Sequence, residues 1–509
     1  MIGQPVVELP SALPAAIFLL PLLAGCLVLA GKSFGSGFSR WTAVLTSGAM
    51  TVIGLVMVWQ VLGGAVLVTW GNELRVDGLS ALMAAIVSGL GFLAAVYSIR
   101  YMEHTDVQTR RGIVAPGRRI DLFYALLLWC LGTMAWGSVT NNIIMLWMAV
   151  EATTLTSGLL VAFFWDRRAL EAGYKYMMLL TVGITFALFG CVVVYAAAAA
   201  SGGLSGREAL LMSEVRGVAG MIPAGTALVA VSMLLIGFGT KAGLAPFHPW
   251  LPDAHAEAPT PVSVLLSGVM IKVALYAMAR TVGIFFPTLP VITLFAVALG
   301  AFSMLLGVIL ALAQDDLKRL LAYHSVSQMG YVLAGVGLGT YLGVFGGLFH
   351  LLNHALFKAL LFMSAGAVIH ATGARKVSEL GGLARKMPLT CLAFLVGGLS
   401  ISGFPPFNGF MSKLTICLAL ASAGMWWAVA AAILASVLTM VAILRKAYLV
   451  FWAAPAAGAA RWESVREVPA TMWVPMMVLA ALCLLFGVAP GVGYGLLHQA
   501  SMILANVGG

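Results

Sequence analysis

The sequence predicts an all-α polytopic membrane protein with about fourteen transmembrane helices. Of its 509 residues, 61% are hydrophobic and only 9% are charged, whereas a soluble domain carries about 25% charged residues. Apolar runs of roughly 20 residues, long enough to cross a hydrocarbon core about 30 Å thick, recur along the whole chain. The basic residues gather in alternate loops between these runs. Together these three features indicate a membrane-spanning helical bundle.

Fourteen apolar runs have the length of a transmembrane span. They cover residues 11–31, 42–66, 79–100, 121–139, 142–165, 172–200, 222–247, 256–280, 284–313, 320–341, 342–371, 388–421, 426–452 and 471–490. The longest loops between them, 101–120 and 453–470, are too short to bury a core of their own, so we expect no soluble domain. The first run lacks a basic leader and a small-residue cleavage site, so we expect a retained helix and not a signal peptide.

The distribution of charge predicts the topology. Of the 28 Lys and Arg residues, 20 fall in loops after odd-numbered spans, and only Arg75, Arg207, Arg216 and Arg280 fall in the other loops. By the positive-inside rule, the basic loops face the cytoplasm and both termini lie outside. This topology accounts for the net charge of +10, so we expect the lipid bilayer as a partner and no nucleic acid.

The chain shows no motif for a cofactor or a nucleotide. Its six cysteines stand singly in apolar runs without CxxC spacing, which argues against a cluster or a zinc site. A phosphate-cradling GxxxxGK[ST] loop and a GxGxxG motif at a helix start are both absent from the sequence. We therefore expect neither a redox centre nor a nucleotide site in this chain.

Five charged residues lie inside the apolar runs. They are Glu151, Lys241, Lys272, Lys358 and Lys413. A charge at the bilayer centre costs about 2.5–3.5 kcal/mol on insertion scales, so five on one chain indicate function. The alternative for any single one is snorkelling to an interface or pairing for packing. This alternative is strongest for Lys272, because its predicted span ends nearby.

Histidines extend this set. The stretch "FHLLNHALFKALLF" spaces His350, His354 and Lys358 at four-residue intervals, which stacks them on one helix face about 6 Å apart. Such a ladder of titratable groups suits proton transfer. Zinc is the competing interpretation, but no third ligand lies nearby, so we expect no metal. His324 in "AYHSVSQMG" is either a further member or a core histidine with satisfied hydrogen bonds.

Two spans are interrupted by glycine and proline. The stretches are "TKAGLAPFHPW" (240–250) in the seventh span and "SISGFPPFNGFMSKL" (400–414) in the twelfth. Because the spans are five apart, the second unit is inverted relative to the first. Interrupted helices at matching places in two inverted halves indicate a transport path. Irregular backbone at that depth is tolerated only against protein or a water-filled cavity.

These residues resemble the antiporter-like subunits of respiratory complex I, the Mrp-type cation/proton antiporters and the energy-converting membrane-bound hydrogenases. The resemblance rests on Glu151, on "GTKAGLAPFHPWLPDAHAEAPTPVSVLLSGVMIKVALYA", on "HLLNHALFKALLF" and on the lysine of "MSK". It implies two inverted five-helix repeats with broken helices 7 and 12. The segments are then an N-terminal three-helix segment (1–120), a first repeat (121–283), a second repeat (284–452), and a cytoplasmic loop with helix 14 (453–509). "EATTLTSGLLVAFF" is most similar to the hydrogenase and formate-hydrogenlyase members.

The resemblance also implies roles for the charged residues. Glu151 and Lys241 resemble the family's glutamate–lysine pair, and Lys413 resembles its terminal residue, which faces one side of the membrane. The residues that resemble the central relay are Lys272, His350, His354 and Lys358, and the further candidates are His324, Lys175 and His255.

The function implied is proton or sodium translocation by one subunit of a redox-driven complex in the inner membrane of a prokaryote. Its partners are then other membrane subunits and a peripheral redox arm, and Fe-S, flavin or NiFe centres lie only in those partners. Two alternatives stay open. An Mrp-type antiporter needs no redox partner, and an ion-coupled transporter of inorganic carbon or another solute uses the same fold.

Overall fold

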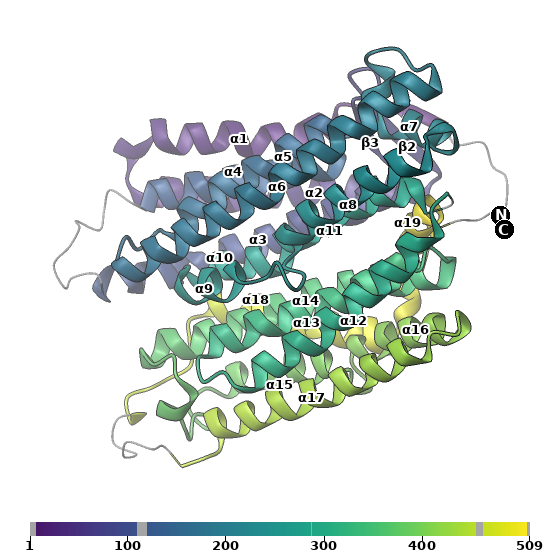
Figure 1. The fold of residues 1–509 in the computed structure, drawn as a ribbon. Coiled ribbons are helices and arrows are strands. Elements are labelled where there is room, and N and C mark those ends of the chain that lie inside the picture. The colour runs from purple at the N-terminus through teal and green to yellow at the C-terminus, as the bar shows by residue number, and fades with distance from the viewer. Residues whose placement is uncertain (1–6, 109–119, 287, 455–461, 506–509) are drawn as a thin grey trace.

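Long helices running side by side between two ends make up nearly all of the chain in the computed structural model (Figure 1). The structure describes residues 7–108, 120–286, 288–454 and 462–505. The longer helices are α1 (Leu13–Ala30), α2 (Ser36–Leu62), α3 (Gly78–Gln108), α4 (Ile120–Val139), α5 (Ile143–Val161), α6 (Arg167–Gly202), α8 (Ala224–Ala242), α11 (Ile271–Val282), α12 (Pro290–Leu312), α13 (Leu317–Gly337), α14 (Tyr341–Thr372), α15 (Pro388–Ser402), α16 (Asn408–Ser422), α17 (Trp426–Phe451), α18 (Ala470–Val488) and α19 (Tyr494–Leu504). The shorter ones are α7 (Met212–Val218), α9 (Trp250–Glu257) and α10 (Thr260–Leu265).

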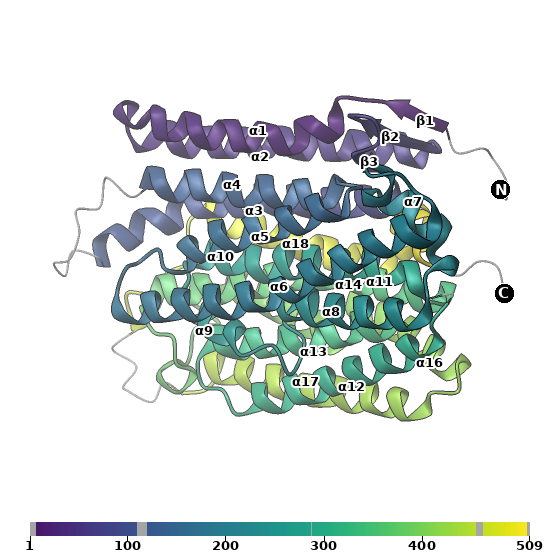
Figure 2. The ribbon, with the colours of Figure 1, turned by 45° about the horizontal axis from the view of Figure 1, so that its top comes forward.

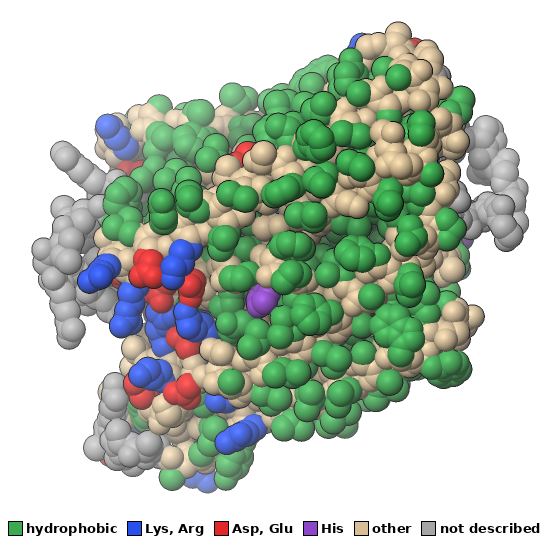
Figure 3. All heavy atoms as spheres, viewed as in Figure 1, with side chains coloured by type: hydrophobic (Ala, Val, Ile, Leu, Met, Phe, Trp, Pro, Cys, Tyr) green, Lys and Arg blue, Asp and Glu red, His purple; other side chains and the backbone are tan. Residues whose placement is uncertain are grey.

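The all-α membrane class is confirmed. Within the described residues, twelve helices are long and apolar enough to cross a membrane. The other two predicted spans correspond to α13 and to the broken pair α15 and α16, so the count of fourteen stays a prediction. Figure 3 shows hydrophobic side chains over most of one face, with charged side chains gathered at its left end. That distribution is the one a multi-pass bundle presents to lipid.

Capping side chains start several of the helices. Asn142 accepts hydrogen bonds from two backbone amides at the start of α5, and Asp316 does the same for α13. Asp166 and Thr340 cap α6 and α14 in the same way. These side chains satisfy amides that a helix N-terminus leaves unpaired. Polar side chains in the short loops therefore fix where these four helices begin.

Both predicted helix breaks are confirmed, and they share one backbone geometry. Gly243 ends α8 at φ +73°, and Gly403 ends α15 at φ +76°, a conformation that favours glycine. In each case the amide of the next residue, Leu244 or Phe404, donates to the carbonyl five residues earlier at 3.0 Å. The shared geometry supports the predicted repeats, whose boundaries stay a prediction.

A small sheet and two helices at one end were not predicted. The strands β1 (Val7–Pro10), β2 (Ala65–Thr69) and β3 (Leu74–Val76) form a sheet in that order, with β1 parallel to β2 and β2 antiparallel to β3. Strands this short carry almost no alternating pattern in the sequence. β2, β3, α7 and α19 lie at the same end of the bundle (Figure 1). Figure 2 shows α1 and α2 as an outer layer over α3 and α4.

We expect Gly409→Ala to destabilise the second break. A Cβ atom at Gly409 would lie 1.7 Å from the backbone carbonyl oxygen of Ser400, so alanine would force α15 and α16 apart. The expected loss is about 1–3 kcal/mol, the usual cost of overpacking, seen as a lower melting temperature in detergent. Gly89→Ala is the matched control, because nothing lies within 4 Å of its Cβ position. A wild-type melting temperature for Gly409→Ala would contradict the close approach.

Candidate functional site

Buried titratable side chains lie between the two broken helices. Those predicted for the site from the sequence are Lys241, Lys272, Lys358, Lys413, His255, His324, His350 and His354, each at most 5% exposed. They come from α8, α9, α11, α13, α14 and α16. Burying so many ionisable groups in a membrane bundle is costly unless each finds polar partners. The partners that each one finds define the candidate site.

Lys241 contacts Glu151 through a hydroxyl and not directly. The Lys241 Nζ donates to the Val150 carbonyl at 2.6 Å and to the Thr154 Oγ1 at 2.5 Å. Thr154 in turn donates to Glu151 Oε2 at 3.1 Å. Thr181 of α6 donates to the other oxygen of Glu151 at 3.2 Å. The expected pair is therefore bridged by Thr154, and Glu151 itself is partly exposed on the side of the bundle.

Two serine hydroxyls and two backbone carbonyls lie between Lys272 and Lys358. Lys272 Nζ donates to the Ser267 carbonyl in the π-helical turn Leu266–Met270, which precedes α11. The Ser267 hydroxyl is hydrogen-bonded to Ser325 at 2.8 Å, and Ser325 donates to the Leu321 carbonyl at 3.2 Å. Lys358 Nζ donates to that same carbonyl. Since Lys272 is fully buried, the snorkelling alternative for it is wrong.

The histidine ladder has the spacing that the sequence predicts. The rings of His350 and His354 stack with their centroids 6.3 Å apart and 6° between planes. His350 Nδ1 contacts the Ser412 hydroxyl at 2.9 Å, and its Nε2 contacts Gln328 Oε1 at 3.1 Å. Within the described residues, no group of three or more His, Cys, Asp or Glu could hold a metal ion. In that part of the chain, the zinc alternative therefore lacks a third ligand.

Three buried histidines lack a protein partner at both ring nitrogens within the described residues. In the described part of the chain, neither ring nitrogen of His255, His324 or His354 makes a hydrogen bond. An unsatisfied buried polar group costs about 1–3 kcal/mol, and buried water is the usual way such groups are satisfied. His324 therefore has no protein partner for its ring nitrogens among the described residues, and both interpretations of this histidine stay predictions.

Lys413 caps the first half of its own broken helix. Its Nζ donates to the Ile401 carbonyl at 2.7 Å and to the Ser436 hydroxyl at 3.0 Å. It also lies 4.7 Å from the ring centre of a buried tyrosine. Ile401 stands in the last turn of α15, where helix carbonyls carry partial negative charge. At the first break, Trp250 Nε1 fills the same role by donating to the Thr240 carbonyl at 2.9 Å.

His255 lies with the buried set. Its ring stacks on Phe362 with the centroids 4.8 Å apart. The Nζ of Lys358 lies 5.6 Å from the centre of that same ring. The second half of broken helix 7 therefore contributes a titratable group next to the central lysines.

Lys175 lies away from the buried set. It is exposed on α6, where it pairs with Glu171 at 2.7 Å and with Asp253 at 3.6 Å. These residues line a charged cavity of about 410 Å³, together with Arg319 and Arg375. The cavity is formed by residues of the predicted cytoplasmic loops and helix ends.

Several polar residues of the site were missed by the sequence analysis. Ser267 and Ser325 connect the central lysines, but serine is too common in membrane helices to stand out. Lys318 was counted as a basic loop residue, yet it is 3% exposed and donates to the Ala258 carbonyl at 2.5 Å. Its position seven residues before Ser325, on one helix face, was the available signal.

Two family models match this chain. The family model "NADH:quinone oxidoreductase/Mrp antiporter, TM" matches residues 140–439, and "NADH-Ubiquinone oxidoreductase (complex I), chain 5 N-terminus" matches residues 66–111. The chain belongs to this antiporter-like family. The resemblance that the sequence motifs carry is thereby confirmed.

Relatives come from several branches of the family. NADH-quinone oxidoreductase subunit N of Desulforudis audaxviator is 33% identical, over 92% of this chain and 94% of the relative. Hydrogenase-4 component B of Escherichia coli is 35% identical, and an Na(+)/H(+) antiporter subunit of Alkalihalophilus pseudofirmus is 33% identical. Each of these two alignments covers 82% of this chain but only 62% and 52% of the respective relative.

Solved structures share the fold. A chain of the membrane-bound sulfane sulfur reductase, an archaeal respiratory membrane complex, superposes with a TM-score of 0.84 at 28% identity, covering 97% of this chain and 98% of that one. A chain of the Mrp complex from Dietzia sp. DQ12-45-1b has the same TM-score and coverage at 24% identity. These relatives are membrane subunits of larger complexes. The prediction that other membrane subunits are partners of this chain is thereby confirmed.

Proposed function

We propose that this antiporter-like protein translocates protons within a redox-driven membrane complex. The observation that carries the proposal is the buried set of lysines and histidines between two broken helices. The hydrogen bonds that join these groups run through hydroxyls and backbone carbonyls. The printed names of the relatives, which include a hydrogenase component and part of an NADH-quinone oxidoreductase, support a redox-driven assembly.

Each charged group has a proposed place in the relay. Glu151 and Lys241, bridged by Thr154, form one end, and Lys272 and Lys358 form the centre. His255, His324, His350 and His354 connect the central lysines to their neighbours, and Lys413 forms the other end. Lys175 lies in the charged cavity at the end of the bundle, so its role is to bring protons or counter-charges to that end.

The energies involved are of the right size for such a relay. Two unit charges about 6 Å apart interact by roughly 2.8 kcal/mol at an effective dielectric near 20. Moving one charge through about 150 mV requires roughly 3.5 kcal/mol. Making and breaking one or two charge pairs is therefore enough to move a proton against the membrane potential.

Protons suit this site better than sodium. A sodium ion needs several oxygen ligands, whereas the described buried set consists of amines and imidazoles. The one carboxylate of the relay, Glu151, hydrogen-bonds to two threonines at the side of the bundle. Positively charged lysines would repel a metal cation, and they can carry a proton themselves.

We place the redox chemistry and the cofactors outside this chain. Fe-S, flavin or NiFe centres would lie in a peripheral arm, with other membrane subunits beside this one. We assign the protein to the inner membrane of a prokaryote, with both termini outside. In support, β1 (Figure 2) and α19 (Figure 1) belong to the end of the bundle opposite the charged side chains (Figure 3), and basic loops stay in the cytoplasm.

An Mrp-type cation/proton antiporter is the second candidate, favoured by the 33% identity to part of an Na(+)/H(+) antiporter. Mass spectrometry of the purified assembly separates the two, because only the redox-driven complex contains Fe-S subunits. An ion-coupled carrier of inorganic carbon or another solute would hold its substrate in uncharged polar surroundings near the middle of the bundle. The buried lysines and histidines of the described chain support an ion relay over such a carrier.

We expect Lys358→Met to stop proton translocation while leaving assembly intact. Methionine keeps the length of the buried side chain and removes the amine, which is the only group that joins Lys358 to the Leu321 carbonyl. The measurement is proton uptake into vesicles that contain the assembled complex. Lys32→Met, at an exposed lysine outside the site, is the control and should pump normally. Full pumping by Lys358→Met would make Lys358 a structural residue.

The topology predicts an external C-terminus. A reporter enzyme that folds only outside the cytoplasm, fused after Gly509, should be active, and a reporter that requires the cytoplasm should be inactive at the same point. Both reporters are then placed after Lys386, in a predicted cytoplasmic loop. There the cytoplasmic reporter should be active and the external reporter inactive. Activity of the cytoplasmic reporter at Gly509 would contradict the assigned orientation.

A further inference from the structure

A second cavity lies at the other end of the bundle from the charged one, and the relay does not use it. Its volume is about 590 Å³. Its lining includes Gly63 just after α2, Asp77 just before α3 and Gly283 just after α11. Because these residues mark the ends of membrane spans, the cavity lies at the depth of the lipid headgroups.

Most of the arginines at this end converge on the cavity. The loops assigned to this side contain four basic residues, and three of them, Arg75, Arg216 and Arg280, line it. The fourth, Arg207, lies on the outside and pairs with Glu73 at 2.8 Å. This side of a membrane protein is normally poor in basic residues, so the convergence is not a general feature of the surface.

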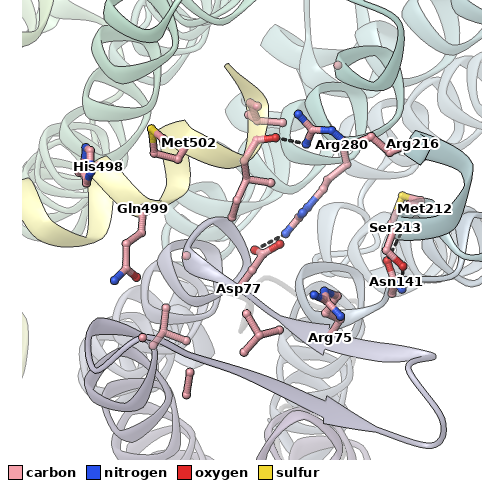
Figure 4. Close-up of a pocket in the computed structure, with 18 of the residues that line it drawn as sticks. Arg75, Asp77, Asn141, Met212, Ser213, Arg216, Arg280, His498, Gln499 and Met502 are labelled. Atoms are coloured by element: carbon pink, nitrogen blue, oxygen red, sulfur yellow. Dashed lines mark hydrogen bonds and ion pairs between the residues drawn. The ribbon is translucent and has the colours of Figure 1, made fainter. Parts of the chain in front are cut away.

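Two of the three guanidinium groups are neutralised by carboxylates. Arg75 pairs with Glu8 at 2.5 Å, and Arg280 pairs with Asp77 (Figure 4). Burial opposes ionisation of Asp77, but the charge and the hydrogen bond of Arg280 outweigh it, so the pKa of this carboxyl lies below its usual range. The Arg280–Asp77 pair is therefore formed at neutral pH, and each of the two arginines has a carboxylate partner that offsets its charge.

Arg216 carries the positive charge that remains. Its hydrogen-bond partner is the backbone carbonyl of Ile503, and no carboxylate among the described residues lies within 4.0 Å of it. Figure 4 shows the Arg216 and Arg280 side chains entering the cavity from the same side, opposite α19. The unpaired charge of Arg216 attracts an anion into this space, and the planar guanidinium group of arginine binds phosphate oxygens in pairs.

The rest of the lining is suited to an amphiphile. Val61, Ile284 and Met502 contribute apolar surface beside the arginines. A free phosphate would leave that surface unused, whereas a phospholipid would cover it with its glycerol and first acyl carbons. The excess of one positive charge matches the single negative charge of a phosphodiester.

We propose that this cavity binds the headgroup of an anionic phospholipid, with Arg216 contacting the phosphodiester. The lipid would connect α7, α11 and α19 at the membrane surface, independently of the proton relay. A zwitterionic phospholipid should bind less well, because its choline cation would meet the same arginines.

The test is photo-crosslinking of the purified complex that contains the full chain, in detergent, with a photoactivatable phosphatidylglycerol. Mass spectrometry should find the label on peptides from α7 or α19. Arg216→Gln should reduce that labelling about tenfold, the effect of losing one hydrogen bond to a charged group. Arg216→Lys keeps the positive charge but lacks the planar guanidinium group, so it should retain part of the labelling. Arg207→Gln is the matched control and should label like the wild type.

Competition identifies the ligand. Unlabelled phosphatidylglycerol should displace the probe, whereas phosphatidylcholine and inorganic phosphate should not. Wild-type labelling of Arg216→Gln, or equal competition by phosphatidylcholine, would overturn the proposal. Displacement by inorganic phosphate alone would overturn the proposal of a lipid ligand and assign the cavity to free phosphate. Displacement by an acidic peptide but not by lipid would assign it to a protein partner.

Discussion

Every backbone group that the two helix breaks set free must find a partner inside the protein, because hydrocarbon offers none. The structure meets this constraint with side chains. Trp250 donates to the Thr240 carbonyl at the first break, and Lys413 donates to the Ile401 carbonyl at the second. A bundle that supplies polar partners at mid-depth can also hold lysines there. The partners found at the breaks and the buried charges are thus two consequences of one requirement, that polar groups inside the bundle be satisfied by the protein. The sheet, α7 and α19 do not depend on this requirement.

The same requirement explains why hydroxyls and carbonyls, and not carboxylates, surround most of the buried lysines. Lys241 contacts Thr154, and Lys272 and Lys358 both reach backbone carbonyls. A direct buried ion pair holds its proton firmly and loses several kcal/mol when one partner is neutralised. A lysine bound to neutral acceptors can become neutral without leaving a carboxylate unpaired. Under the proposed function, such lysines can exchange protons along the set, whereas a static salt bridge would hold the proton in place.

The helices, the breaks and the buried lysines could be predicted from the sequence, because a lipid bilayer imposes simple rules on the chain that crosses it. Apolar runs gave the helices, and the Gly-Pro interruptions near 243 and 403 gave the breaks. The free-energy cost of placing a charge in hydrocarbon was enough to single out the buried lysines as functional candidates. The sequence could not show that Thr154 separates Glu151 from Lys241, because a hydroxyl bridge depends on how α5 and α8 pack. Nor could it show that Lys318 is buried, or that three arginines distant in sequence share one cavity.

The central claim is that Lys241 carries a proton and does not merely pair with its neighbours. Lys241→Arg tests it most directly, because arginine keeps the positive charge but does not release a proton in a protein. The measurement is proton flux together with turnover, for assembled complexes in vesicles, with assembly verified by co-purification. The account predicts an assembled complex whose proton flux is lost. Near-normal flux with arginine at this position would contradict the account and leave Lys241 with a structural role.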